Sequence, residues 1–106
     1  MRVGYDYTGV AVIFCCHDGK GNFLLSKRGQ GARDEQGVWE FGGGKLEFGE
    51  TLEEAIKREM QEEYGCSALA IDALPPVSLV RKKENGTMHW VLIPSIVLVF
   101  THYLFS

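Results

Sequence analysis

The sequence is poor in the features that mark disulfide-rich, secreted or membrane-spanning proteins. It has three cysteines among 106 residues, and none of them forms a C-x-x-C pair. The adjacent Cys15 and Cys16 would point to opposite faces of a strand. We therefore expect no disulfide framework and a reducing, cytoplasmic compartment. The N-terminal residues MRVGYDYTG lack the apolar stretch of a signal peptide.

Charge is missing from the end of the chain. No charged residue follows Glu84, which leaves 22 uncharged residues. A membrane helix needs about 20 apolar residues. Here Asn, Gly, Thr, His, Pro and Ser interrupt the stretch, and β-branched residues dominate its centre. We therefore expect buried strand and no membrane contact.

The net charge of −3 is concentrated in one segment. Between Glu47 and Glu63 there are seven acids and two bases, whereas the rest has seven acids and nine bases. An acidic total argues against a nucleic-acid binder, which normally shows a basic face. The basic run Arg81–Lys83 is the feature that supports nucleic-acid binding. A solvated hairpin tip explains this run more simply. We expect no nucleic-acid partner.

The hydrophobic pattern predicts one α/β domain over residues 1–106. Thr51 and Glu54 have capping-box spacing and Gly65 suits a helix end, so a helix is expected over 51–65. The expected strands are short and apolar, and a glycine-rich loop precedes the helix. The strands are 8–16, 22–29, 38–41, 66–74, 77–83 and one or two within 87–100, and the loop is 42–50.

The pattern contains a single amphipathic helix, which can cover one face of a sheet. Continuous apolar strands such as VAVIFCC and SIVLVF need cover on both faces. We therefore expect a homodimer through the C-terminal segment, with a tail folded over its own sheet as the alternative. The residues behind this prediction are Ile96, Leu98, Phe100, Leu104 and Phe105.

Three glutamates occupy one side of the predicted helix. Glu59, Glu62 and Glu63 are three or four positions apart and overlap the apolar stripe. Carboxylates that converge near a core repel one another and are costly to desolvate. A hard cation such as Mg²⁺ would resolve that conflict. The simpler alternative is a charged amphipathic helix with Arg58 as one more surface charge.

Three consecutive glycines, Gly42, Gly43 and Gly44, precede this helix. Glycine permits unusual backbone angles and the close approach of a ligand. A glycine-rich loop that leads into a helix N-terminus often binds phosphate. Gly44 and Lys45 are therefore candidates for substrate binding.

These residues resemble the Nudix box, G-x5-E-x7-R-E-U-x-E-E-x-G-U, in which U is a bulky aliphatic residue. The matching segment is GKLEFGETLEEAIKREMQEEYGC, from Gly44 to Cys66. Cys66 replaces an aliphatic residue at the last U position. The residues in register are Gly44, Glu50, Arg58, Glu59, Met60, Glu62, Glu63 and Gly65.

The resemblance implies a Mg²⁺-dependent hydrolase, with Mn²⁺ as a substitute, that cuts a phosphoanhydride bond in a nucleoside diphosphate derivative. Glu59, Glu62 and Glu63, with the Gly43 carbonyl, would hold the metal. Glu59 or Glu62 would orient or deprotonate the attacking water. Arg58 and Glu50 would hold the ligands in place. Arg28 lies where family members often contact substrate. The alternative interpretation is that Arg28 is a solvated charge at the end of a strand.

The family resemblance also implies a mixed β-sheet sandwiched by helices, here without the C-terminal helix because no second helical pattern follows. Gly42 stands where the family usually has Pro, and no acid follows Glu84 to act as a distal base. The proline of the ADP-ribose type and the tyrosine of the dinucleoside-polyphosphate type would fall near Lys82 and Glu84, and neither is present. A nucleoside triphosphate, intact or damaged, is the substrate expected by elimination. The alternative function is a non-catalytic module that binds a nucleotide or a partner.

Overall fold

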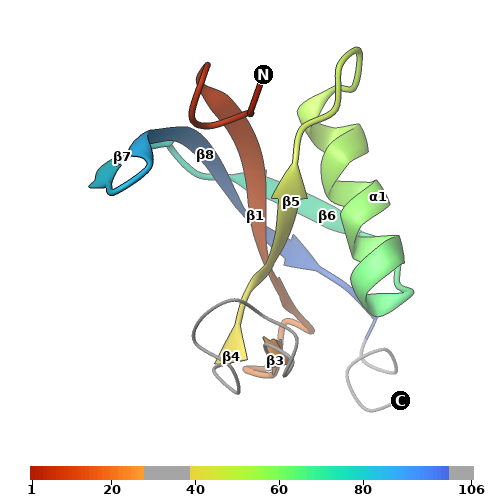
Figure 1. The fold of residues 1–106 in the computed structure, drawn as a ribbon. Coiled ribbons are helices and arrows are strands. Elements are labelled where there is room, and N and C mark those ends of the chain that lie inside the picture. The colour runs from red at the N-terminus through yellow and green to blue at the C-terminus, as the bar shows by residue number, and fades with distance from the viewer. Residues whose placement is uncertain (28–38, 101–106) are drawn as a thin grey trace.

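The computed structural model describes residues 1–27 and 39–100. Its elements are β1 (Gly9–His17), β2 (Phe23–Leu24), β3 (Ser26–Lys27), β4 (Trp39–Glu40), β5 (Gly42–Lys45), α1 (Leu52–Tyr64), β6 (Ala70–Ala73), β7 (Val77–Lys83) and β8 (Gly86–Leu98). A six-stranded sheet has the order β2-β1-β8-β6, with β5 also paired to β1 and β7 also paired to β8 (Figure 1). A separate ribbon pairs β3 with β4.

The centre of the sheet is the parallel pair of β1 and β8. Gly9 lies opposite Trp90, and the register continues to His17 opposite Leu98. The other pairs described in this sheet are antiparallel. The sheet is therefore mixed, as the family resemblance implies.

One face of β1 carries the core. Val12, Phe14 and Cys16 are fully buried, and the buried residues of α1 belong to the same cluster. Alternate residues such as Ala11 and Ile13 are only partly buried. The prediction that β1 is buried on both faces is therefore wrong for the described residues, because α1 covers one face only and no second helix lies in this part of the chain.

Both ends of α1 form as predicted. The Thr51 side chain accepts a hydrogen bond from the Glu54 amide, and the Glu54 carboxylate accepts one from the Thr51 amide. Gly65 ends the helix in the left-handed region with φ of 66°. Within residues 1–27 and 39–100, no helix has the length and apolar character that crossing a bilayer requires.

From the sequence alone we would expect Pro94 at a sheet edge or a bulge, but it lies in the central strand β8. On one side of β8, β7 pairs as far as Leu92 and β6 begins its pairing at Ser95. Pro94 lies between these two partners, and its carbonyl accepts a hydrogen bond from the Leu74 amide. The missing N–H of Pro94 faces the same side, where neither strand needs it.

Two predicted segments differ in the structure. Residues 42–45 form strand β5 against β1, although the glycines predicted a loop. Glycine is depleted in strands, so propensity argued against this pairing. The expected strand 22–29 begins as two separate pairs, β2 with β1 and β3 with β4.

Candidate active site

The free edge of β5 faces α1 and supplies main-chain groups to it. The Gly43 amide donates to Glu63 Oε2 at 3.2 Å, and the Lys45 carbonyl accepts from Arg58 Nη2 at 3.2 Å. In a strand, the N–H and C=O of one residue point to the same side, and residues two apart share that side. The Gly43 carbonyl therefore points toward the carboxylates of α1, as a metal ligand at this position would need.

Arg58 organises the charges next to this edge. Its Nε and Nη2 donate to the two oxygens of Glu50 at 2.7 and 2.9 Å, and its Nη1 donates to Glu59 Oε1 at 2.7 Å. The side chains of Glu50 and Glu59 are each 14% exposed, which limits screening by water. The hydrogen bonds from Arg58 and the Glu47 amide lower the pKa of Glu50 to about 2. Glu50 and Arg58 therefore form a fixed, fully ionised pair.

Glu63 lies in a different electrostatic environment. Burial raises the pKa of its carboxyl group above the usual value, and the charges of Glu59, Glu40 and Glu62 raise it further. The hydrogen bond from the Gly43 amide acts in the opposite direction. Carboxylates that raise one another's pKa are the conflict that a bound cation would relieve.

The three glutamates are neighbours, but they do not converge on one point. Arg58 Nη1 lies 3.5 Å from Glu62 Oε2. The Glu62 side chain is 59% exposed, whereas the sequence predicted that it would point toward the body of the protein. In the part of the chain that the structure describes, no group of three His, Cys, Asp or Glu side chains is arranged to hold a metal ion. The donor set itself fits: hard carboxylate oxygens beside an outward carbonyl are the ligands that Mg²⁺ prefers.

Gly42 and Gly44 explain how the glutamates reach the strand. A Cβ on Gly44 would lie 2.3 Å from the carboxyl carbon of Glu59, and one on Gly42 would lie 2.7 Å from Glu63 Oε2. Neither glycine has a positive φ. The predicted unusual backbone angles are therefore absent, and the close approach is made by the protein's own carboxylates.

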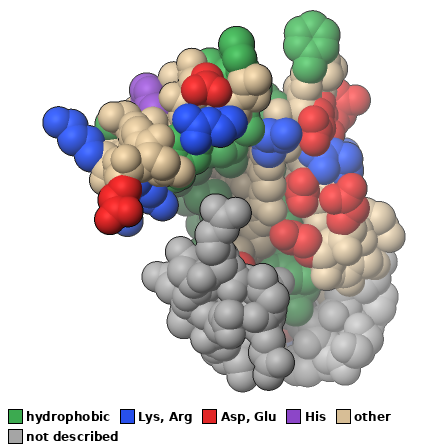
Figure 2. Space-filling view, viewed as in Figure 1, with side chains coloured by type: hydrophobic (Ala, Val, Ile, Leu, Met, Phe, Trp, Pro, Cys, Tyr) green, Lys and Arg blue, Asp and Glu red, His purple; other side chains and the backbone are tan. Residues whose placement is uncertain are grey.

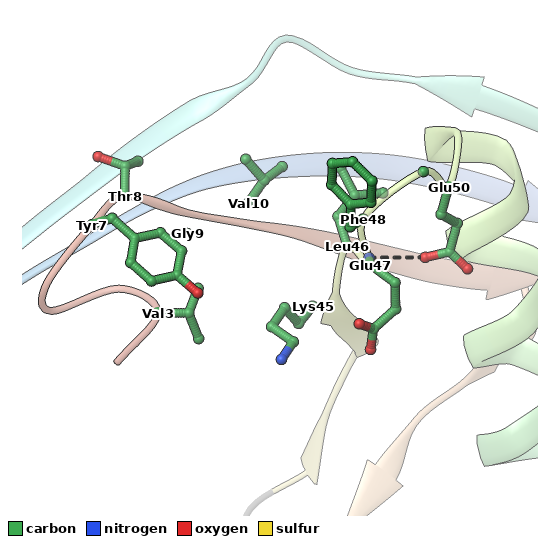
Figure 3. Close-up of a pocket in the computed structure, with 11 residues that line it drawn as sticks. Val3, Tyr7, Thr8, Gly9, Val10, Lys45, Leu46, Glu47, Phe48 and Glu50 are labelled. Atoms are coloured by element: carbon green, nitrogen blue, oxygen red, sulfur yellow. Dashed lines mark hydrogen bonds between the residues drawn. The ribbon is translucent and has the colours of Figure 1, made fainter. Parts of the chain in front are cut away.

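Two pockets adjoin this edge. The Gly43 pocket, of about 410 Å³, is lined by Ala11, Val12, Ile13, Glu40–Gly44 and Glu63. The Lys45 pocket, of about 530 Å³, is lined by Val3, Tyr7–Val10 and Lys45–Glu50 (Figure 3). In Figure 2 the acidic side chains gather over α1 and the loop before it, and basic ones over the β7–β8 hairpin. Any polyanion bound here would thus need a positive charge to offset the acids.

Most of the residues that the sequence predicted for a site lie together here, and other residues beside them were not predicted. Arg28, predicted to contact substrate, lies outside the described residues. Tyr7 and Phe48, which line the Lys45 pocket, carried no signal, apart from the turn-forming Gly49 after Phe48. Glu40, whose charge raises the pKa of the Glu63 carboxyl group, also escaped prediction, because it lies four residues before Gly44 and has no place in the motif.

Comparison with known proteins gives a consistent result. The sequence matches the NUDIX domain family over residues 7–103. Nucleoside triphosphatase NudI of Enterobacter sp. (strain 638) is 43% identical over 85 residues, covering 76% of this chain and 58% of the relative. The 8-oxo-dGTP diphosphatase of Proteus vulgaris is 50% identical over 57 residues, covering 54% and 51%. The chain spans about half the length of the curated relatives it matches.

A solved structure agrees in fold. The MutT NUDIX hydrolase from Burkholderia pseudomallei superposes with a TM-score of 0.71 at 30% identity, over 86% of this chain and 67% of that one. The similarity covers the part of the chain that holds the mixed sheet, the helix α1 and the glutamates beside the glycine-rich strand β5. On the match over residues 7–103, this chain belongs to the Nudix family.

Proposed function

We propose that this chain hydrolyses a phosphoanhydride bond in a nucleoside triphosphate, intact or damaged, to a nucleoside monophosphate and pyrophosphate. The observation that carries the proposal is the Arg58 network, which holds Glu50 and Glu59 beside the outward main chain of Gly43 and Lys45. The similarity to a nucleoside triphosphatase and an 8-oxo-dGTP diphosphatase supports this choice of substrate.

Glu59, Glu62, Glu63 and the Gly43 carbonyl would hold Mg²⁺, or Mn²⁺ in its place. When bound, the ion supplies positive charge that offsets the phosphate charge and makes water more acidic. Glu50 and Arg58 would keep Glu59 in position. Lys45, on the rim of the same edge, would contact a phosphate oxygen.

The base that accepts the proton from the attacking water would be Glu62. Arg58 donates to Glu59 at 2.7 Å but lies 3.5 Å from Glu62, which is also the more exposed side chain. Glu62 is therefore the freer acceptor of the two. The water oxygen bonds to phosphorus, the bridging P–O bond between the α and β phosphates breaks, and the leaving group takes the electron pair of that bond.

The Gly43 pocket would receive the nucleobase. Phe41, which is 54% exposed, lines it together with Ala11 and Ile13. A planar base could stack on such a ring while its phosphates reach Glu63 at the rim. This places the scissile bond beside the carboxylates.

Pyrophosphate release across a panel of nucleoside triphosphates and their oxidised forms tests the proposal directly. We expect turnover that depends on Mg²⁺ and stops on chelation. Nucleotide binding without release of pyrophosphate or formation of the monophosphate would instead identify a non-catalytic binding module.

We also propose a homodimer and a reducing, cytoplasmic environment. Ile96 is 38% exposed and lies opposite Cys15 in the β1–β8 pairing, on the sheet face away from α1. Leu98 and Phe100 continue the segment, whereas Leu104 and Phe105 lie outside the described residues.

The three cysteines are free thiols, and burial raises the pKa of Cys16 to about 12, which suits an unreactive structural role.

A further inference from the structure

The strand β7 has a free edge. It pairs with β8 from Val77 opposite Leu92 to Lys83 opposite Gly86, and among the described residues no other strand pairs with it. The β7–β8 hairpin projects from the sheet, well apart from α1 (Figure 1). A free strand edge presents a row of main-chain N–H and C=O groups, which can pair with another extended chain.

The contacts of β8 show which residues of β7 point to that edge. The His89 amide donates to the carbonyl of Gly4, in the segment that leads into β1, so the main chain of His89 points away from β7. Residues opposite each other in an antiparallel pair point either toward each other or both away. Val80 lies opposite His89, so its N–H and C=O face the free edge. Ser78 and Lys82 share this direction, because residues two apart in a strand point to the same side.

The side chains along β7 are exposed and become basic toward the hairpin turn. Val77 is 51% exposed and Val80 is 58% exposed. The cations Arg81–Lys83 follow, and within the described part of the chain none of them is paired with a carboxylate. With Glu84 as its one acid, the hairpin has a balance of +2, and Figure 2 shows its basic side chains apart from the acids of α1. An acidic segment would therefore be attracted here although the whole chain has a charge of −3.

The same charges disfavour pairing of β7 with a second copy of itself. Lysine often protects free strand edges, because two positively charged edges repel each other. That protection covers one half of β7 only, since Val77–Val80 carry no charge. The edge thus discriminates against its own copy but not against an acidic strand.

We propose that the free edge of β7 binds an extended acidic segment of a partner protein as an added antiparallel strand. The main chain of Ser78, Val80 and Lys82 would supply the hydrogen bonds, and the side chains of β7 would select the sequence. In an antiparallel arrangement, acids at the start of the segment lie opposite Arg81–Lys83, and β-branched residues after them lie opposite Val77–Val80. This surface is separate from the carboxylates of α1, so its test does not involve turnover.

The probe is a fluorescein-labelled peptide of three glutamates followed by four alternating valines and threonines. Anisotropy titration with the full chain should show saturable binding that weakens as salt is added. Lys82→Glu should raise the Kd by about tenfold, because an attraction becomes a repulsion. Lys20→Glu, the same change at an exposed position in the turn after β1, is the matched control and should alter the Kd by less than about twofold. A peptide with lysines in place of the glutamates should not bind.

A main-chain readout separates strand pairing from attraction between charges. On saturation with the peptide, hydrogen exchange measured by NMR should slow at the amides of Ser78, Val80 and Lys82, whereas those of Leu79 and Arg81, which face β8, should change little. A peptide N-methylated at its three central residues keeps its charge but loses donors on both of its edges. It should bind the wild-type chain about tenfold more weakly.

Several results would overturn the proposal. Equal affinity of the N-methylated and unmodified peptides, or no slowing of the three outward amides, would show that charge alone attracts the peptide. Absence of saturable binding, or equal losses in Lys82→Glu and Lys20→Glu, would exclude this edge as the binding surface. Tighter binding of a single-stranded RNA oligonucleotide than of the peptide would assign the basic hairpin to nucleic acid instead.

Discussion

Gly43 and Gly44 are adjacent in β5, yet side chains are excluded at the two positions by different neighbours. A Cβ on Gly43 would lie 2.5 Å from the Val12 carbonyl oxygen, which belongs to the rigid central strand β1. A Cβ on Gly44 would meet the carboxyl group of Glu59, the movable end of a side chain. The first contact can be relieved only by shifting the sheet, and the second by displacing a candidate metal ligand.

The two glycines should therefore separate stability from activity. Gly44→Ala should lower turnover by about 10- to 100-fold, as for a disturbed ligand position, with little change in melting temperature. Gly43→Ala should destabilise the fold by more than about 1 kcal/mol. Thermal melts and rates of pyrophosphate release on both variants give the comparison, and equal effects of the two substitutions on stability would contradict it.

Charge removal at single glutamates tests the metal assignment. Glu62→Gln and Glu63→Gln keep the side-chain volume but lose the charge that would hold Mg²⁺, so turnover should fall by more than about 100-fold while the fold survives. Glu53→Gln is the control, because Glu53 pairs with Lys57 on the exposed side of the same helix. Near-wild-type turnover in both variants would remove these residues from the mechanism.

Asp18 makes the folded state sensitive to acid. The Asn22 side chain and the amides of Lys20 and Asn22 donate to its carboxylate, which is 8% exposed, and these bonds hold its pKa below the usual value. A lowered folded-state pKa means that the contribution to stability is present at neutral pH and is lost as pH falls below about 3.9.

Asp18→Asn should therefore lower the melting temperature at pH 7, and the difference from the wild type should narrow as the pH falls through that range. Glu84→Gln, at the β7–β8 hairpin, is the control for a general loss of negative charge. A difference that is constant from pH 7 to pH 3 would show that Asp18 acts through its shape and not its charge.

At the scale of elements, residues at its two ends define where α1 begins and where it ends. Thr51→Ala removes the acceptor for the Glu54 amide and should cost about 1 kcal/mol. For a chain of this size that corresponds to a drop of about 4 °C in melting temperature. Ser67→Ala, at an exposed position beyond the helix, should change it by less than about 1 °C on the same scale. Circular dichroism melts would distinguish the two.

An element could be predicted from the sequence when the contacts that define it lie within a few residues of one another. Thr51, Glu54 and Gly65 set the helix by contacts within a few residues, so the sequence located both ends. β5 depends on pairing with β1 across the sheet, and three glycines conceal it. Pro94 likewise looked like an edge residue because the gap between β6 and β7 that accommodates it arises only in the assembled sheet. The placement of Glu50 and Arg58 beside Glu59 was expected from the family motif, whereas the pocket residues Tyr7 and Phe48 were not expected.

At the scale of the whole molecule, the sheet face opposite α1 decides the oligomeric state that we expect. Ile96 is 38% exposed and Phe100 is 50% exposed, in the segment predicted to pair two copies. Light scattering at micromolar concentration should give the mass of a dimer. Ile96→Asp should shift it to a monomer, whereas Val80→Asp, at a 58% exposed position on β7, should not. A wild-type monomer mass that is unchanged on dilution would overturn the prediction.

The parallel pairing of β1 with β8 also sets the order in which the molecule can fold. Every residue pair in that ladder joins positions 81 apart in sequence, as does the contact between Thr8 and His89. Closing so long a loop costs entropy before any contact offsets it, and proteins rich in such contacts fold slowly. The helix and the β7–β8 hairpin can form early from local signals. During synthesis, however, β1 leaves the ribosome long before β8, so the edge of β1 that pairs with β8 must stay unpaired until residues 90–98 have emerged.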